Sequence, residues 1–148
     1  MFNKVLFVCL GNICRSPMAE GIFKQWLIDH QSTIEVNSAG LSAVVGNSAS
    51  RKAQALLKIR DIDISNHVAR QLTDAQVRAA DLILVMEEEQ KKQIEGMYSY
   101  ALGKVFLLGK WSNFEVPDPY GGQVSDYEYA VTLIDKGLQD WQKRICPE

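Results

Sequence analysis

The chain has 148 residues, of which 47% are hydrophobic and 23% are charged, and its formal net charge at pH 7 is −2. A chain of this length can bury a core without disulfides or metals, so we expect a single domain over residues 1–148. The charge balance argues against nucleic acid as a partner. No segment is long and apolar enough to insert into a membrane. Three cysteines without metal-like clustering favour a reducing cytoplasm.

The first half of the chain predicts strands and helices in alternation. Ser16 suits the N-cap of a helix and Pro17 its first position, and apolar side chains at helical spacing follow. The expected elements are a buried strand at residues 5–8, a helix from Pro17 to about Asp29, a strand at residues 34–38, and a helix capped by Asn47 and Ser48 that ends at Leu57.

The second half continues this alternation. Residues 81–86 and 104–108 predict two more strands, and Glu87, Glu88 and Glu89 suit the first turn of the helix between them. A capping box at Ser125 and Glu128 opens the last helix, which is expected to bury Tyr127, Val131, Ile134, Leu138, Trp141 and Ile145. Strands that alternate with helices predict an α/β fold, with a parallel sheet covered on both faces.

The segment between the first strand and the first helix carries the strongest chemical signal, Cys9-Leu-Gly-Asn-Ile-Cys-Arg-Ser16. A loop that enters a helix N-terminus gathers unpaired N–H groups, which favour an anion and hold a cysteine as thiolate. Arg15 offers a planar fork for two phosphate oxygens. Gly11 and Asn12 tolerate positive φ. The pattern predicts a cysteine-dependent phosphatase, although a packed, inert Cys9 is the alternative from these residues alone.

A thiolate mechanism also needs a proton donor for the departing oxygen. Asp118 is the candidate, because Pro117 and Pro119 restrict its backbone and could hold its carboxyl group over the site. The same aspartate would then activate water in the second step. The alternative is an ordinary turn aspartate, since aspartate and proline both favour turns.

Segments in a fixed order along nearly the whole chain closely resemble low-molecular-weight protein-tyrosine phosphatases. They are Val8 to Glu20, Asn37-Ser-Ala-Gly40, His67-Val-Ala-Arg-Gln71, Asp81 to Met86, and Pro117-Asp-Pro-Tyr120. The short loop after Gly40 and the Tyr-Gly-Gly ending are most similar to bacterial members associated with capsule and exopolysaccharide production. This resemblance implies a four-stranded parallel sheet in three layers, a phosphocysteine intermediate and no cofactor or metal.

The resemblance also assigns roles to individual residues. Cys9, Arg15 and Asp118 would be catalytic, and Ser16 would either hydrogen-bond the thiolate or cap the helix. Ser38 and His67 would brace the loop together with Asn12. Cys14 could form a reversible disulfide with Cys9. The residues expected to contact the phosphate or the substrate are Leu10, Gly11, Asn12, Ile13, Cys14, Ser16, Leu41 and Tyr120, with Val44 and Val45 completing an apolar rim.

The resemblance further implies partners. The substrate would be a phosphotyrosine protein, specifically a membrane tyrosine autokinase of the polysaccharide machinery, with inorganic phosphate as product. Leu41 stands where deeper-pocket members often carry an aromatic residue, and Gly121 replaces a usual second tyrosine. Both departures predict a more open rim.

Other activities also use a cysteine on such a loop. Arsenate reductases need two relay cysteines, yet residues 87–97 contain none and Cys146 is a poor substitute. Protein-arginine phosphatases tend to carry threonine at the position of Ile13. A phosphocysteine carrier of the sugar phosphotransferase system would not need a remote Asp118. A non-catalytic phosphotyrosine-binding module would need neither Cys9 nor that acid.

Overall fold

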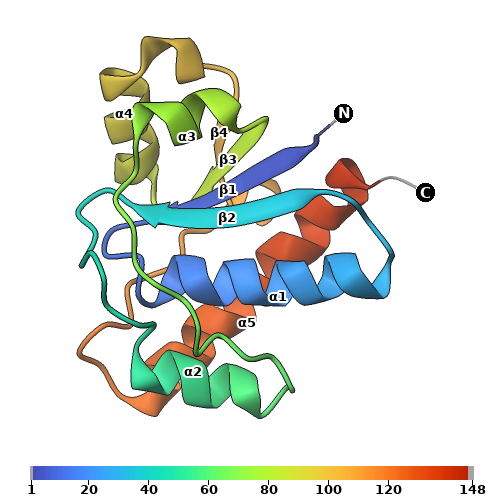
Figure 1. The fold of residues 1–148 in the computed structure, drawn as a ribbon, viewed down its shortest axis with the longest axis vertical. Coiled ribbons are helices and arrows are strands. Elements are labelled where there is room, and N and C mark those ends of the chain that lie inside the picture. Colours follow the sequence, from blue (N-terminus) through green and yellow to red (C-terminus); the bar gives the residue numbers. More distant parts are fainter. Residues whose placement is uncertain (1, 147–148) are drawn as a thin grey trace.

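The computed structural model describes residues 2–146, and a sheet of four parallel strands runs through its centre (Figure 1). The strands are β1 (Lys4–Cys9), β2 (Glu35–Gly40), β3 (Leu82–Val85) and β4 (Val105–Leu107), and their order in the sheet is β2-β1-β3-β4. Each neighbouring pair is parallel. The predicted α/β fold with a four-stranded parallel sheet is therefore confirmed.

Helices cover both faces of this sheet. They are α1 (Arg15–Asp29), α2 (Arg51–Lys58), α3 (Asp74–Ala79), α4 (Glu88–Met97) and α5 (Val124–Ile145), with short 3₁₀ turns at Ser99–Ala101 and Lys110–Ser112. In Figure 1, α1, α2 and α5 lie on one side of the sheet, and α3 and α4 lie on the other. Among residues 2–146, no helix has the length and apolarity required to cross a bilayer.

Strand β1 separates two hydrophobic clusters because successive side chains point to opposite faces. Val5 and Phe7 pack into the larger cluster with α1, α2 and α5, whereas Leu6 and Val8 pack into the smaller one with α3 and α4. All four side chains are at most 3% exposed. A strand buried on both faces is typical of parallel sheets and explains the continuous apolar run in the sequence.

Three predicted helix starts were wrong by a few residues. Helix α1 begins at Arg15 with Cys14 as N-cap, so Pro17 lies inside the first turn, where a backbone N–H would have no intrahelical acceptor. Helix α2 is capped by Ser50 rather than by Asn47 and Ser48. The capping box of α5 joins Gln123 and Asp126, two residues before the predicted Ser125 and Glu128.

Helix α3 was not predicted. It has only six residues, so its apolar periodicity is too short to stand out. A signal was nevertheless present, because Thr73 and Gln76 form a reciprocal capping box at its start.

The packing of α5 against the segment after β4 can be tested at Gly137. A Cβ atom there would lie 2.7 Å from Leu108 Cγ and 2.8 Å from the Leu108 carbonyl oxygen. We expect Gly137→Ala to lower the free energy of unfolding by about 1–3 kcal/mol, because backbone cannot move aside easily. Urea denaturation measures the change.

Gly96 in α4 provides the matched control. It is exposed, and a Cβ atom there would meet nothing within 4 Å. Gly96→Ala should therefore raise the free energy of unfolding by roughly 0.5–1 kcal/mol, because alanine is the better helix former. Equal effects of the two substitutions would contradict the close packing of α5 on Leu108.

Candidate active site

The carboxyl end of β1 leads into a loop that borders a cavity of about 230 Å³. Parallel α/β sheets bind ligands at this edge. The structure brings Asp118 to the same cavity as Cys9 and Arg15, although about a hundred residues separate them in the chain. The lining residues are Cys9, Leu10, Gly11, Ile13, Cys14, Arg15, Ser42, Val44, Asp118 and Tyr120.

A larger hollow of about 570 Å³ lies behind the loop, between α1 and the segment at residues 61–70. Ser38 and His67 line it, but neither Cys9 nor Arg15 does. The smaller cavity is therefore the one in which the side chains of Cys9, Arg15 and Asp118 meet.

The backbone of the loop is held by hydrogen bonds to its carbonyl groups. The six carbonyl groups from Cys9 to Cys14 accept hydrogen bonds, in chain order, from the N–H groups of Leu41, Ser42 and Val44, from Nε2 of His67, and from the N–H groups of Ser50 and Met18. By contrast, the N–H groups of residues 11–14 donate to no acceptor within residues 2–146. Consecutive N–H groups without acceptors at a helix start form a binding site for an anion.

Asn12 shapes this loop through its backbone and its side chain. Its φ is +59°, in the left-handed region, whereas Gly11, which tolerates a positive φ equally well, does not adopt one. The buried side-chain amide of Asn12 donates to Ser16 Oγ at 2.8 Å and to Ser38 Oγ at 3.0 Å, and its oxygen accepts from the N–H of Arg70 at 2.9 Å. One asparagine therefore joins the loop to α1, β2 and the segment after α2.

The Ser16 hydroxyl lies 2.8 Å from the Cys9 sulfur atom. Because Ser16 Oγ already accepts from Asn12, its own proton is free to point toward Cys9. Ser16 lies inside α1 and makes no capping hydrogen bond, so the structure favours the thiolate contact over the capping role.

Ser38 and His67 approach the loop from β2 and from the segment after α2. Ser38 donates to Glu20 Oε1 at 2.6 Å, and His67 Nε2 donates to the Asn12 carbonyl group at 2.7 Å. The Nδ1 atom of His67 lies 4.0 Å from Glu20 Oε1. These contacts have the geometry that a bracing role requires, and the role itself remains a prediction.

Arg15 is buried, with 2% of its surface exposed. Its Nη1 atom donates to Glu87 Oε2 at 2.5 Å and to the Val116 carbonyl group at 2.9 Å, and its Nη2 atom lies 3.7 Å from Asp118 Oδ2. Its Nε atom is buried and has no hydrogen-bond partner among the described residues. The guanidinium group is thus held at one end and keeps donor capacity for an anion in the cavity.

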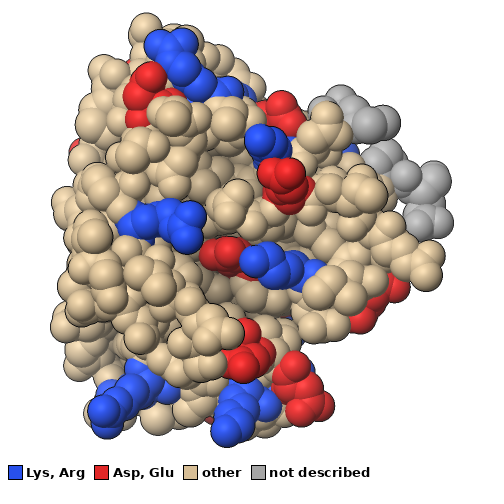
Figure 2. Space-filling view, in the orientation of Figure 1, with Lys and Arg blue, Asp and Glu red and all other residues tan. Residues whose placement is uncertain are grey.

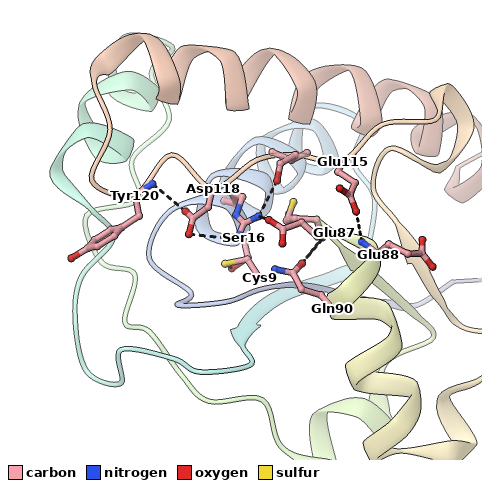
Figure 3. A network of polar contacts seen from close by, with 11 residues as sticks. Cys9, Ser16, Glu87, Glu88, Gln90, Glu115, Asp118 and Tyr120 are labelled. Atoms are coloured by element: carbon pink, nitrogen blue, oxygen red, sulfur yellow. Dashed lines mark hydrogen bonds and ion pairs between the residues drawn. The ribbon is translucent and has the colours of Figure 1, made fainter.

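Asp118 and Tyr120 lie on the loop before α5. Figure 3 shows the Asp118 carboxyl group near Cys9, whereas the Tyr120 ring points away from it. Asp118 Oδ1 accepts from the N–H of Tyr120 at 3.1 Å, and the Asp118 side chain is 40% exposed. Gly121 adopts a φ of +77°, and the N–H of Gly122 closes a turn onto Pro119.

Leu41 does not form the rim that the sequence predicted. Its N–H group continues the β2 ladder onto Cys9, and its side chain packs into the smaller hydrophobic cluster at 7% exposure. Ser42 and Val44 line the cavity instead, and Val45 is 67% exposed without lining it.

Glu87 is a site residue that sequence reasoning missed, because its place at the start of a helix already accounted for an acidic side chain. The available signal was its position just after β3, at the same sheet edge as Cys9. Its contact with Arg15 indicates that it orients the guanidinium group.

We expect Glu87→Gln to lower kcat/KM for a phosphotyrosine peptide by about 10- to 100-fold, because neutralising the Glu87 carboxylate weakens its hold on the buried guanidinium group, and each loss of about 1.4 kcal/mol is a factor of ten. Steady-state kinetics at pH 7 measure this loss. Glu89→Gln is the control, since Glu89 is an exposed neighbour on the same helix. A Glu87 variant as active as the Glu89 variant would rule out the orienting role.

A cysteine and an arginine at the two ends of a loop between a strand and a helix, around an anion site, are typical of one class of protein, the cysteine-dependent phosphatases. The family model "Low molecular weight phosphotyrosine protein phosphatase" matches residues 4–148. The chain belongs to this family, and it is a protein-tyrosine phosphatase. The predicted family and enzyme class are confirmed.

Individual relatives agree with this assignment. The chain is 42% identical to a low molecular weight protein-tyrosine-phosphatase, Ptp, of Acinetobacter johnsonii, over 97% of this chain and 99% of the relative. It is 39% identical to the low molecular weight protein-tyrosine-phosphatase Wzb of Salmonella typhimurium, over 100% of this chain and 97% of the relative.

Solved structures share the fold over almost the full length. Wzb of Vibrio vulnificus in complex with benzylphosphonate has a TM-score of 0.91 at 36% identity, covering 97% of this chain and 99% of that one. A YwlE arginine phosphatase, as a mutant with a phosphorylated active-site serine, has a TM-score of 0.92 at 30% identity, covering 98% and 97%.

Proposed function

We propose that Cys9 attacks the phosphorus atom of phosphotyrosine and that Asp118 protonates the departing phenolic oxygen. The P–O bond breaks as the S–P bond forms. In the second step Asp118 takes a proton from water, the water oxygen attacks phosphorus, and the S–P bond breaks to release inorganic phosphate. One observation carries this proposal: the three side chains border one cavity with the unpaired loop N–H groups.

Arg15 and the N–H groups of Leu10, Gly11, Asn12, Ile13 and Cys14 would hold the phosphoryl oxygens. The buried Nε–H of Arg15 and its fixed plane suit a charge that spreads in the transition state. Ser16 would donate to the Cys9 thiolate and ease its departure, while Ser38 and His67 would keep Asn12 in place. Val44 and Tyr120 would flank the aromatic ring of the substrate.

Phosphotyrosine is favoured over phosphoarginine as the substrate because Ile13 lines the cavity. Its branched apolar side chain offers no partner to a guanidinium group, and it leaves the site suited to an aryl ester. The structural likeness to the YwlE arginine phosphatase makes phosphoarginine the alternative substrate to test.

The test is phosphate release from matched phosphotyrosine and phosphoarginine peptides, with EDTA present because no metal is expected. We expect turnover of the phosphotyrosine peptide, and Ile13→Thr should shift the ratio toward phosphoarginine. Faster release from the phosphoarginine peptide by the native chain would overturn the tyrosine assignment.

We further propose that residues 1–148 act as a single domain in the cytoplasm on a membrane tyrosine autokinase of capsule or exopolysaccharide production. The match to relatives named Wzb supports this pathway. Free Cys9, Cys14 and Cys146 suit a reducing compartment. Acidic and basic side chains are interspersed on the face shown in Figure 2, without a patch of one sign. Unchanged phosphorylation of the kinase after deletion of this protein would contradict the proposed partner.

A further inference from the structure

The loop at residues 9–15 has a second set of contacts, which comes from the start of α2 and from α5. The N–H of Ser50 donates to the Ile13 carbonyl group at 2.8 Å. The hydroxyl group of Tyr127 in α5 lies 3.4 Å from the Cys14 sulfur atom and 3.2 Å from Ser50 Oγ. Two residues of the loop are thus joined to α2 and α5 through one serine and one tyrosine.

The direction of these hydrogen bonds follows from the chemistry of each group. Ser50 Oγ accepts from the N–H of Ala53 as the N-cap of α2, so its own proton is free to donate to the Tyr127 oxygen. The Tyr127 proton then points toward Cys14. Burial raises the pKa of Tyr127 to about 12, so this donor stays protonated at neutral pH. Burial also raises the pKa of the Cys14 thiol, which keeps a second negative charge away from Cys9.

A buried tyrosine needs a hydrogen-bond partner in any protein, and Ser50 alone would satisfy Tyr127. The position of the contact with Cys14 indicates a role beyond satisfying the hydrogen-bonding capacity of Tyr127. Cys14 is the N-cap of α1 and provides no capping side-chain hydrogen bond, so its orientation depends on its neighbours. The N–H groups of Ile13 and Cys14 are among those without an acceptor, and Arg15 follows directly.

We propose that Ser50 and Tyr127 are positioning residues that fix Ile13 and Cys14 and thereby aim the last N–H groups of the loop at the phosphoryl group. They touch neither the substrate nor the reacting atoms, and they act through the loop. The inference rests on the proposed function of that loop as the phosphate site.

Tyr127→Phe tests the proposal with the loss of one hydroxyl group. Small displacements of groups that orient a reaction cost large factors, up to about 100-fold for 1 Å. We expect kcat/KM for p-nitrophenyl phosphate to fall by about 10-fold, and the inhibition constant of inorganic phosphate to rise by a similar factor. Calorimetric titration with inorganic phosphate gives the binding change without turnover.

Ser50→Ala and the double variant complete a thermodynamic cycle. Because both side chains belong to one chain of contacts, the double variant should lose little more than the worse single variant. If the fold losses of phosphate affinity in the two single variants multiply in the double variant, Ser50 and Tyr127 contribute independently. That result would contradict a shared positioning role.

Tyr129→Phe is the matched control, because Tyr129 lies on the same helix but is 57% exposed. A merely structural Tyr127 would lower the melting temperature of its variant and leave phosphate affinity at 25 °C equal to that of the control. That result would overturn the inference. Failure of the proposed function is distinguishable, since the native chain itself would then neither turn over the ester nor bind phosphate.

Discussion

Replacing Cys9 with serine is expected to abolish the release of phosphate from a phosphotyrosine peptide, by at least about 10⁴-fold. A serine hydroxyl at this place is a poor nucleophile, because its neighbour Ser16 is a hydroxyl donor at 2.8 Å and the proposed mechanism uses Asp118 as an acid, not as a base, in this step. Arg15 and the loop N–H groups are untouched, so the variant should still bind inorganic phosphate. Phosphate release and calorimetric phosphate binding, each with EDTA present, measure the two properties separately.

Cys146→Ser provides the control for this experiment, since Cys146 is a free thiol at the far end of α5 that does not line the cavity. It should retain native turnover. Full activity of the Cys9 variant would show that the nucleophile has been assigned incorrectly. Loss of both turnover and phosphate binding would instead indicate a misfolded loop, which circular dichroism and the melting temperature would reveal.

Replacing Asp118 with asparagine is expected to lower kcat/KM for a phosphotyrosine peptide by about 10²- to 10⁴-fold, the usual range for removal of a general acid. This parameter reports the step in which the phenol departs and excludes the later hydrolysis of the phosphocysteine, which is the same for every ester. The side chain lies on the rim of the cavity near Cys9 (Figure 3), and its Oδ2 atom lies 3.7 Å from Nη2 of Arg15. Because p-nitrophenolate departs without protonation far more readily than the phenolate of tyrosine, the loss with p-nitrophenyl phosphate should be much smaller. The ratio of the two losses is the decisive measurement.

The control is Asp61→Asn, which makes the same chemical change in an exposed residue that lines the larger hollow behind the loop. Asp61 has a φ of +59°, a conformation that asparagine tolerates well. Equal losses with both esters in the Asp118 variant would mean that this carboxyl group positions Arg15 and does not donate the proton.

The fold was predictable because its strands have a local signal. Residues 5–8 are continuously apolar, and such a run requires a sheet buried on both faces. The order of the strands and the start of α1 depend on contacts between distant segments. Ser16 illustrates the limit, since this good capping residue is the second residue of the helix and its hydroxyl group contacts Cys9 instead.

In the candidate site, too, some residues could be predicted from the sequence and others could not. Cys9 and Arg15 are close in the chain, and their spacing predicts a shared anion site when it is combined with the strand before it and the helix start after it. Leu41 was placed wrongly because the direction of its side chain depends on how far the β2 ladder continues, which the sequence does not specify. Glu87 and Tyr127 were missed as partners of the loop because each also suits an ordinary structural role.

The hydrogen bonds to the loop carbonyl groups come from segments that are synthesised after the loop itself. Cys9 and Arg15 emerge early in synthesis, but the donors to the loop carbonyl groups extend to His67, and the Arg15 contacts extend to Asp118. A nascent chain therefore carries the reactive sequence long before it can carry the reactive geometry. Catalytic competence should appear only when nearly the whole chain has folded, so activity during refolding would report the final cooperative step.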